Sequence, residues 1–527
     1  MLVLLLTGLA APAAAGVIAD HDALIGRLMV DRGLSCGRVA TIIEHVDPGW
    51  RCVLEGSENA LRWRPACHEV LELRCEVPGW NDASLSLSDA EVKLVGLAAY
   101  NDAGWSVSGA GDIDGDGLDD VVVGTPGYTT DDYASGAAWL VSGATLSATS
   151  GAFSLADADA AVLGDTGDER LGQAVAGPGD VDGDGYDDLL LGVQLGDGDG
   201  SGSGEVYLFL GPLSGEIALA DADIALSGEA DDSAGSAVAS EDVDGDGQID
   251  LLIGAKNSGD VGAVYVVQGP ISAEVALSDA EARLIGGYPE DWAGEALDGA
   301  GDIDGDGVGD VIIGAHGEDD GGAYAGAAYL ALGPISGDLD LEDIDYKIIG
   351  ETSNDQAGAA VAGAGDMNGD GLDDVAVGAP FVTVSASDVG ALYLLSGATL
   401  VDHGGGVFDL SDADSELHGD SDSALGYAVS GAGDTDGDGF DDVVAGAFHD
   451  EEVGYWAGAA WLVLGGETIP GVLDVKLLAE SRDDYAGSSV SGAGDVDGDG
   501  LDDLLIGAYG DDDGGSSAGA AYLFLGR

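Results

Sequence analysis

The stretch Asp112-Ile-Asp-Gly-Asp-Gly-Leu-Asp-Asp120 places carboxylates at positions 1, 3, 5 and 9 of a nine-residue segment. Carboxylates packed this closely repel one another unless a cation lies between them. Ca²⁺ takes about six to eight oxygen ligands from carboxylates, backbone carbonyls and water. The stretch therefore predicts a Ca²⁺ loop in which residues 1, 3, 5 and 9 bind through side chains. Residue 7, Leu118, is expected to bind through its backbone carbonyl.

The pattern occurs seven times, at intervals of 60 to 68 residues. A regular period of this length is typical of a repeat architecture with one structural unit per period. The predicted side-chain ligands at positions 1, 3, 5 and 9 are Asp112, Asp114, Asp116 and Asp120; Asp180, Asp182, Asp184 and Asp188; Asp242, Asp244, Asp246 and Asp250; Asp302, Asp304, Asp306 and Asp310; Asp366, Asn368, Asp370 and Asp374; Asp434, Asp436, Asp438 and Asp442; and Asp495, Asp497, Asp499 and Asp503. The predicted carbonyl ligands at position 7 are Leu118, Tyr186, Gln248, Val308, Leu372, Phe440 and Leu501. The sequence thus predicts up to seven Ca²⁺ sites, and Asn368, which removes one charge, predicts weaker binding in the fifth.

Other acidic motifs begin in the same way. An EF-hand loop needs an acidic residue at position 12, but here that position is apolar in every copy, as in Val123 and Leu191. Nine-residue β-helix repeats need short contiguous periods, and cysteine-linked acidic repeats need cysteines in this region; the sequence has neither. Plain Asp-Gly turns between strands are the remaining alternative, and they leave the clustered charges unexplained.

Short strands with Gly-rich punctuation surround each loop. Around the first loop we expect strands at 91–96, 103–109, 120–126 and 136–143. Four strands per period predict an all-β fold, a seven-bladed β-propeller spanning residues 83–527. The last repeat ends one strand short, and the spare strand 91–96 can complete it and close the ring. An aromatic residue recurs in register on each fourth strand and is expected to pack between blades: Trp139, Tyr207, Tyr265, Tyr329, Tyr393, Trp461 and Tyr522.

The first 82 residues differ in composition from the rest. Residues 1–16 join an apolar run to an Ala-rich tail, which predicts a secretory signal peptide, although no Lys or Arg precedes the run; a buried N-terminal segment is the alternative. Residues 17–82 hold all the cysteines, Cys36, Cys52, Cys67 and Cys75. An even count in an exported protein predicts a small domain with two disulfides of undetermined pairing, and zinc at Cys67-His68 is the rival interpretation. This segment is also comparatively basic, so it either docks onto the acidic repeats or forms an independent module.

The chain carries 100 acidic and 15 basic residues, a formal net charge of −85. Such a surface repels nucleic acids and anionic lipids, so both are excluded as expected partners. Apolar runs between the acidic loops provide a core, which argues against disorder. After residue 16 no stretch is long and apolar enough for a membrane span. We therefore expect a mature protein outside the cytoplasm, secreted or at the cell surface.

These repeats resemble the FG-GAP repeats of the integrin α-subunit β-propeller and of similar bacterial proteins, over residues 88–527. The Phe-Gly element keeps its glycine in Ala103-Gly104, Leu171-Gly172, Ala234-Gly235, Ala293-Gly294, Ala357-Gly358, Leu425-Gly426 and Ala486-Gly487. The Gly-Ala-Pro element is complete at Gly378-Ala-Pro380 and varied elsewhere, as in Gly124-Thr-Pro126. The resemblance implies Ca²⁺ sites on one face of the propeller and partner recognition on the other. These residues include none of the leg domains, the membrane helix or the inserted von Willebrand-type domain of integrins, so we do not expect a true integrin.

The expected function is a calcium-stabilised module, not an enzyme, that binds an unidentified extracellular protein or glycan and serves in cell adhesion. Acidic and aromatic loops expected on the recognition face are 129–133, 289–292, 450–456 and 482–485; ordinary solvated loops are the alternative. A propeller-based extracellular hydrolase or lyase needs a convergent polar cluster near the channel. The repeats hold few histidines, His316, His403, His418 and His449. A structural surface or matrix component is the third possibility.

Overall fold

The computed structural model describes residues 51–54, 73–76, 80, 84–129, 134–165, 169–197, 200–271, 275–385 and 387–527. The chain divides into two compact units, residues 1–81 with Arg527, and residues 82–526. In the first unit, β1 (Arg51–Leu54) pairs antiparallel with β2 (Leu73–Glu76), and the register places Cys52 opposite Cys75. The predicted signal segment, Cys36 and Cys67 lie outside the described residues, so the disulfides and the zinc alternative stay predictions.

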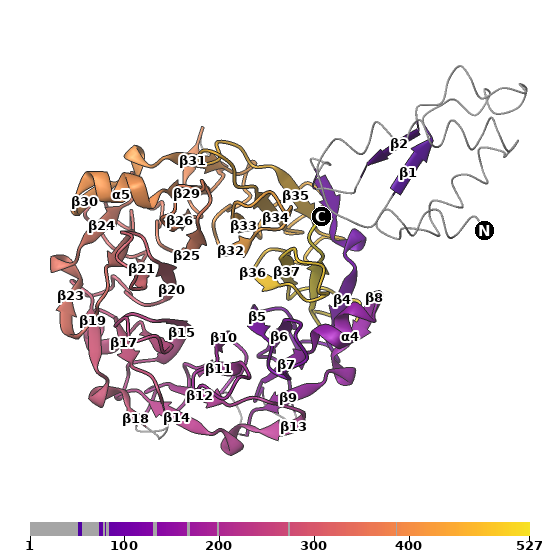
Figure 1. Ribbon diagram of the computed structural model, residues 1–527, viewed down its shortest axis with the longest axis horizontal. Helices are drawn as coiled ribbons and strands as arrows, with labels where there is room; N and C mark the ends of the chain where they lie inside the picture. Colours follow the sequence, from indigo (N-terminus) through magenta and orange to yellow (C-terminus); the bar gives the residue numbers. More distant parts are fainter. Residues whose placement is uncertain are drawn as a thin grey trace, which may run out of the picture. The chain divides into compact units, whose positions relative to one another are not determined.

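The second unit is a seven-bladed β-propeller, with its blades arranged around a central axis (Figure 1). We number the blades from the first acidic loop. Each blade contains four antiparallel strands, counted here from the axis outward. The first strands are β5 (Val107–Gly111), β10 (Ala174–Gly179), β15 (Ala234–Glu241), β20 (Ala296–Gly301), β25 (Ala360–Gly365), β32 (Val429–Gly433) and β36 (Ser489–Gly494). The second strands are β6 (Asp120–Thr125), β11 (Asp188–Val193), β16 (Asp250–Ala255), β21 (Asp310–Ala315), β26 (Asp374–Ala379), β33 (Asp442–Ala447) and β37 (Asp503–Ala508).

The outer half of each blade is shorter. The third strands are β7 (Ala137–Val141), β12 (Glu205–Phe209), β17 (Ala263–Val267), β22 (Ala327–Ala331), β29 (Ala391–Leu395), β34 (Ala459–Val463) and β38 (Ala520–Phe524). The fourth strands are β9 (Ala160–Leu163), β14 (Ile224–Ser227), β19 (Ala282–Ile285), β24 (Tyr346–Ile349), β31 (Ser415–His418), β35 (Val475–Leu478) and β4 (Val92–Val95). The second strands are apolar runs buried along their whole length, because each blade packs between two others.

The expected strand at 103–109 is displaced in the structure. β5 begins at Val107, whereas Ala103 makes only an isolated bridge to Gly519. Asp102 and Gly104 have φ angles of 55° and 77°, which break the extended backbone. The Phe-Gly element is therefore a turn before the strand.

Blades 1–4, 6 and 7 have a fifth, outermost strand that the sequence analysis did not predict. It runs parallel to the fourth strand and comes from the segment that leads into the fourth strand of the next blade. These strands are β13 (Gly215–Ala218), β18 (Val275–Ala276), β23 (Gly337–Asp340), β30 (Gly406–Asp409), β3 (Ser84–Ser86) and β8 (Gly151–Ser154). Each is followed by a 3-10 turn: η4 (Leu219–Asp221), η6 (Leu277–Asp279), η7 (Leu341–Asp343), η8 (Leu410–Asp412), η2 (Leu87–Asp89) and η3 (Leu155–Asp157). The turn buries its leucine, and the chain crosses to the next blade.

A few short elements lie in the connections. Within the described ranges the α-helices are α4 (Gly143–Ser147) and α5 (Gly397–His403), each capped by a serine side chain. A 3-10 turn, η5 (Ser258–Asp260), precedes β17, and a small hairpin of β27 (Thr383–Val384) and β28 (Ser387–Asp388) extends from blade 5. None of the helices in the described residues is long and apolar enough to cross a membrane.

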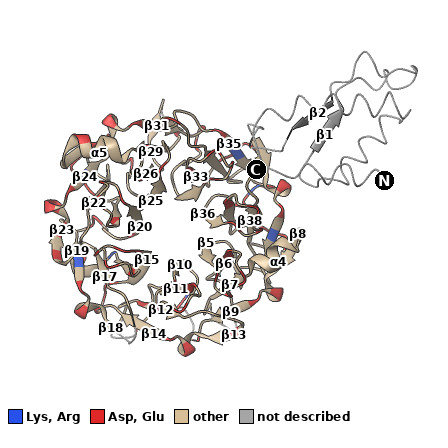
Figure 2. Ribbon diagram, in the orientation of Figure 1, with Lys and Arg blue, Asp and Glu red and all other residues tan. Residues whose placement is uncertain are grey.

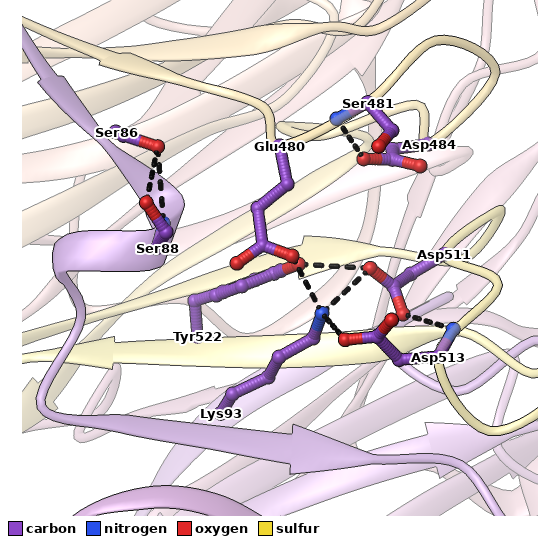
Figure 3. A network of polar contacts seen from close by, with 9 residues as sticks. All are labelled: Ser86, Ser88, Lys93, Glu480, Ser481, Asp484, Asp511, Asp513 and Tyr522. Atoms are coloured by element: carbon purple, nitrogen blue, oxygen red, sulfur yellow. Dashed lines mark hydrogen bonds and ion pairs between the residues drawn. The ribbon is translucent and has the colours of Figure 1, made fainter.

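The two ends of the repeat region meet in the last blade. β4 pairs antiparallel with β38, and β3 pairs parallel with β35 of blade 6. Lys93 on β4 lies 8% exposed and donates to Glu480, Asp511 and Asp513 at 2.8, 2.9 and 2.6 Å (Figure 3). The N-terminal strand is thus held in blade 7 by backbone pairing and by a buried cation.

The aromatic residues of the third strands pack in the core, as predicted. Tyr265, Tyr329, Tyr393 and Tyr522 are at most 1% exposed and Trp139 is buried, whereas Tyr207 and Trp461 are partly buried. Tyr393 of blade 5, for example, lies in a cluster with Ile312 and Leu330 of blade 4. These rings therefore join neighbouring blades.

Candidate metal centres

Each acidic loop joins the first strand of a blade to the second. In blade 1 the Asp112 carboxylate accepts hydrogen bonds from the Asp116 and Gly117 N–H groups, both at 2.9 Å. Asp114 accepts from the Asp116 N–H at 3.1 Å, and Asp116 accepts from the Leu118 N–H at 3.0 Å. Gly115 and Gly117 have φ angles of 76° and 90°, so the backbone can turn tightly around the carboxylates.

The loop geometry gathers the carboxylates of positions 1, 3 and 5. Their ligand oxygens lie within 4.8 Å of one another in the following sets: Asp112, Asp114 and Asp116; Asp180, Asp182 and Asp184; Asp242, Asp244 and Asp246; Asp302, Asp304 and Asp306; and Asp434, Asp436 and Asp438. The loops at Asp366 and Asp495 make the same pattern of backbone hydrogen bonds. Hard carboxylate oxygens at this separation are the donor set that Ca²⁺ prefers.

The position 9 carboxylates lie deeper than the other predicted ligands. Asp120 is fully buried and accepts from the Ile113 N–H at 3.1 Å and from the Gly143 N–H at 2.9 Å. Each of its oxygens keeps a further lone pair. Burial raises the pKa of Asp120 to about 7 and that of Asp503 to about 8, and the other loop carboxylates add to the effect. A bound cation would favour the ionised form of these groups.

Blade 5 differs at position 3. The Asn368 side-chain N–H₂ group donates to both carboxylate oxygens of Asp374 at 3.3 Å, and its oxygen accepts from the Asp370 N–H at 3.0 Å. Asn368 therefore occupies the place of the aspartate with one charge fewer. Some position 7 side chains contact the loop of the preceding blade: Leu118 lies over Gly498 of blade 7, and Tyr186 lies over Gly115 of blade 1.

Comparison with known families supports the repeat assignment. The FG-GAP repeat model matches residues 103–141, 172–209, 234–267, 293–330, 357–395 and 486–524. The protein is an FG-GAP repeat β-propeller. Blade 6 lies outside the matched segments but has the same strand order.

The FG-GAP propeller is similar to integrin α subunits. It is 30% identical over 237 residues to integrin alpha pat-2 of Caenorhabditis briggsae, covering 40% of this chain and 18% of the relative. It is 31% identical over 231 residues to integrin alpha-PS2 of Drosophila melanogaster, covering 40% and 15%. It is 36% identical over 159 residues to human integrin alpha-X, covering 28% and 13%. The matched part is thus less than a fifth of each relative.

The face opposite the acidic loops carries connected aromatic rings. We call eight of these residues the aromatic arc: Trp105, Tyr427, Phe448, His449, Tyr455, Trp456, Tyr485 and Tyr509. Successive ring centroids lie 3.9 to 5.7 Å apart along two runs, from Trp105 through Tyr509 and Tyr485 to Trp456, and from Tyr427 through Phe448 and His449 to Trp456. Tyr455 is 54% exposed and stacks on Trp456 at 4.5 Å.

The loops expected to form a recognition face differ in how far their side chains are exposed or packed. Of residues 129–133, all but Thr129 lie outside the described residues. In loop 289–292, Trp292 stacks on His316 with ring centroids 5.0 Å apart. The predicted acidic surface is partly internal, because Asp450 is buried against Lys476 at 2.7 Å and Asp484 is buried under the Ser481 N–H.

Three buried lysines form sites that sequence reasoning missed. Lys93, Lys347 and Lys476 each meet three carboxylates and lie over the ring of Tyr522, Tyr329 or Trp461 at 5.1 to 5.6 Å. Burial alone lowers the pKa of the Lys93 ammonium, but its carboxylate hydrogen bonds outweigh burial and raise the pKa. In Figure 2, acidic residues recur around the ring and basic ones are few. The only sequence signal was a lysine at the second position of a fourth strand.

Proposed function

We propose that this protein is an extracytoplasmic adhesion or binding module whose propeller is stabilised by up to seven Ca²⁺ ions. The carboxylates of positions 1, 3 and 5 converge in loop after loop at one end of the blades, and this repetition carries the proposal. Positions 9 and 7 complete each proposed ligand set. The similarity to integrin α subunits supports a role in binding an extracellular protein or glycan.

Calcium titration of the full chain tests the metal half of the proposal. Calorimetry is expected to give a stoichiometry approaching seven, because each loop supplies its own carboxylates. Metal that binds only the folded state adds to its stability, so the melting temperature must fall in chelator. Heat signals from only one or two ions, or an unchanged melt in chelator, would contradict it.

The aromatic arc is the proposed recognition surface. Exposed aromatic rings offer large contact area, and tyrosine adds a hydroxyl for hydrogen bonding. Arrays of glycans and cell-surface proteins, screened with the full chain in calcium, identify the ligand class. We expect Tyr455→Ala and Trp456→Ala to lose that binding. Tyr288→Ala is the matched control, because Tyr288 is 57% exposed but lies outside the arc; equal loss in all three variants would count against the arc.

One cluster favours a second candidate, a propeller-based hydrolase or lyase. Glu295 meets Lys256 at 2.8 Å and His316 at 3.4 Å, which brings a cation, a carboxylate and an imidazole together. Burial lowers the pKa of His316, so this imidazole is neutral near pH 7 and able to accept a proton. Turnover of sugar or phosphodiester substrates that disappears in Glu295→Gln would establish the enzyme. A structural matrix role would give neither turnover nor specific array binding.

A further inference from the structure

The residue at position 8 of one acidic loop hydrogen-bonds to the loop of the preceding blade. In blade 2 this residue is Asp187, which is not one of the predicted metal ligands. Its N–H donates to the carbonyl of Asp112 in blade 1 at 3.2 Å, and its carboxylate accepts from the N–H of Asp112 at 2.7 Å. One residue therefore binds both backbone groups of the first predicted ligand in the neighbouring loop.

The same two hydrogen bonds recur at four other junctions. The carboxylate bonds measure 2.7 to 2.9 Å and the backbone bonds 3.2 to 3.4 Å. The pairs are Asp373 on Asp302, Asp441 on Asp366, Asp502 on Asp434, and Asp119 on Asp495. The last pair spans the junction between blade 7 and blade 1, so the contact also crosses the closure of the ring.

In these loops a glycine precedes the position 1 aspartate and leaves space for the position 8 carboxylate of the neighbouring blade. A Cβ on Gly111 would lie 2.1 Å from the Asp187 carboxylate, and one on Gly494 would lie 2.2 Å from that of Asp119. Both glycines also have φ near 65° to 69°. Space and backbone conformation therefore both require glycine here.

The junction between blades 3 and 4 reaches the same arrangement with the two residue types exchanged. Blade 3 has Glu241 where the others have glycine, and blade 4 has Gly309 where five of the other blades have aspartate. Glu241 accepts from the Asp242 N–H at 3.0 Å, and the Gly309 N–H donates to the Asp242 carbonyl at 3.0 Å. A Cβ on Gly309 would lie 2.4 Å from Glu241. The carboxylate is thus kept at the same place although the opposite blade supplies it.

The junction between blades 2 and 3 is the exception. Position 8 of blade 3 is Ile249, which offers no carboxylate to the loop that begins at Asp180. Position 7 is Gln248, and its side chain donates to Asp246 of its own loop at 3.1 Å. The loop of blade 2 therefore receives less support from its neighbour than the loop of blade 1 does.

We propose that the position 8 carboxylates are positioning residues that fix the calcium loop of the preceding blade, so that at these five junctions the metal site depends on the next blade around the ring. This inference rests on the proposed calcium function. Residues behind a ligand orient it and reduce the ordering that binding requires. Loss of Asp187 should therefore weaken the site at 112–120 and leave its own site at 180–188 nearly unchanged. The site of blade 2 is the one that depends least on its neighbour.

Hydrogen exchange of the full chain, read in peptides that cover each loop during a calcium titration, tests this direction. In Asp187→Ala we expect the calcium midpoint of peptide 112–120 to rise about 10-fold or more. Asp187→Asn keeps an acceptor oxygen and should restore most of the midpoint. Ile249→Asp should lower the midpoint of peptide 180–188, and it serves as the gain-of-function variant if Asp187→Ala folds poorly.

Measurements in chelator separate the two proposals. Asp187→Ala should speed exchange at 112–120 even without calcium, because the hydrogen bonds between Asp187 and Asp112 do not need the ion. If no peptide of the unmutated protein responds to calcium, the proposed metal function fails. The measurement in chelator still shows whether Asp187 stabilises the loop at 112–120. A midpoint change confined to 180–188 in Asp187→Ala, or no change at 180–188 in Ile249→Asp, would overturn the inference.

Discussion

The carboxylate at position 9 of each acidic loop is buried, unlike most aspartates in proteins. Asp120, Asp188 and Asp442 sit under the loops, accept backbone N–H groups and have raised pKa values because of burial. Their neighbours at positions 1, 3 and 5 lie nearer the solvent. In the absence of metal, these position 9 carboxylates therefore take up protons at a higher pH than an aspartate of the unfolded chain does.

The first prediction follows from those pKa values. An aspartate in the unfolded chain titrates near about 3.9, whereas burial raises the pKa of Asp310 and Asp374 to about 7 and that of Asp503 to about 8. Between these values the folded, metal-free protein binds more protons than the unfolded chain, so its free energy of unfolding falls as pH rises. We expect the melting temperature in chelator to fall from about pH 5 to about pH 8, and the stabilisation by calcium to grow over the same range. A metal-free melt that rises with pH would contradict this.

A second prediction concerns Asn368 in blade 5. Asn368→Asp restores the charge found at this position in the other loops and removes the amide that donates to Asp374. Calcium affinity depends on the number of charged ligands, so we expect the calcium midpoint of peptide 366–374 to fall about 10-fold. Exchange at 434–442 provides the internal reference, and an unchanged midpoint at 366–374 would show that the amide ligates as well as the carboxylate.

At the scale of elements, the fourth strand of blade 7 comes from the other end of the repeat region. β4 carries Lys93, and the Tyr522 hydroxyl bonds the same Asp511 at 2.9 Å (Figure 3). β24 in blade 4 carries Lys347 among Glu318, Asp320 and Glu342, at 2.7 to 3.0 Å. The two lysines have similar surroundings. However, β24 follows the third strand of its own blade in the sequence, whereas β4 is far in sequence from the other strands of blade 7.

The third prediction compares these lysines. Removing one partner of a buried ion pair leaves charges uncompensated and costs about 3 kcal/mol, less where a carboxylate is exposed, as Asp513 is. Lys93→Met and Lys347→Met should therefore lower the melting temperature by similar amounts. Only Lys93→Met should also expose residues 84–96 to limited proteolysis, because only that strand can leave its blade. Equal cleavage there in both variants would mean that Lys93 plays no special part in closure.

At the scale of the whole molecule, the charge of −85 works against compact folding. The acidic residues are distributed around the ring, and three lysines are committed to internal contacts. We therefore expect cations from solution to stabilise the propeller, either bound in the proposed loop sites or screening the surface.

A fourth prediction separates these two effects. Screening acts on all exposed charges, so potassium chloride should raise the melting temperature of the chelated protein gradually. Micromolar to millimolar calcium should raise it far more at the same ionic strength, because binding at defined sites follows mass action. Magnesium at matched concentration is the control, since it demands a smaller octahedral site. Equal effects of the two ions would argue for screening alone.

Much of the propeller could be predicted because its information is local. The acidic loops, the apolar second strands such as Val121–Val123 and the aromatic register of the third strands each repeat within one period. The fifth strands could not be predicted, since a segment such as Gly151–Ser154 has no alternation and pairs with a different blade. The Lys93–Asp511 contact joins residues 418 apart, and the role of Asp187 depends on a neighbouring blade. Contacts between residues of different blades cannot be predicted from the sequence pattern of a single repeat.

The pairing of β4 with β38 also sets the order in which this protein can be made. Residues 92–95 precede all seven acidic loops in the chain, but their partner strand, 520–524, is made only after the other six blades. Until β38 has been synthesised, β4 has no partner strand, and the Lys93 ammonium remains hydrated. Contacts this distant in sequence form slowly. A nascent chain that has not reached residues 520–524 cannot close the ring, so closure of the propeller must follow the synthesis of blade 7.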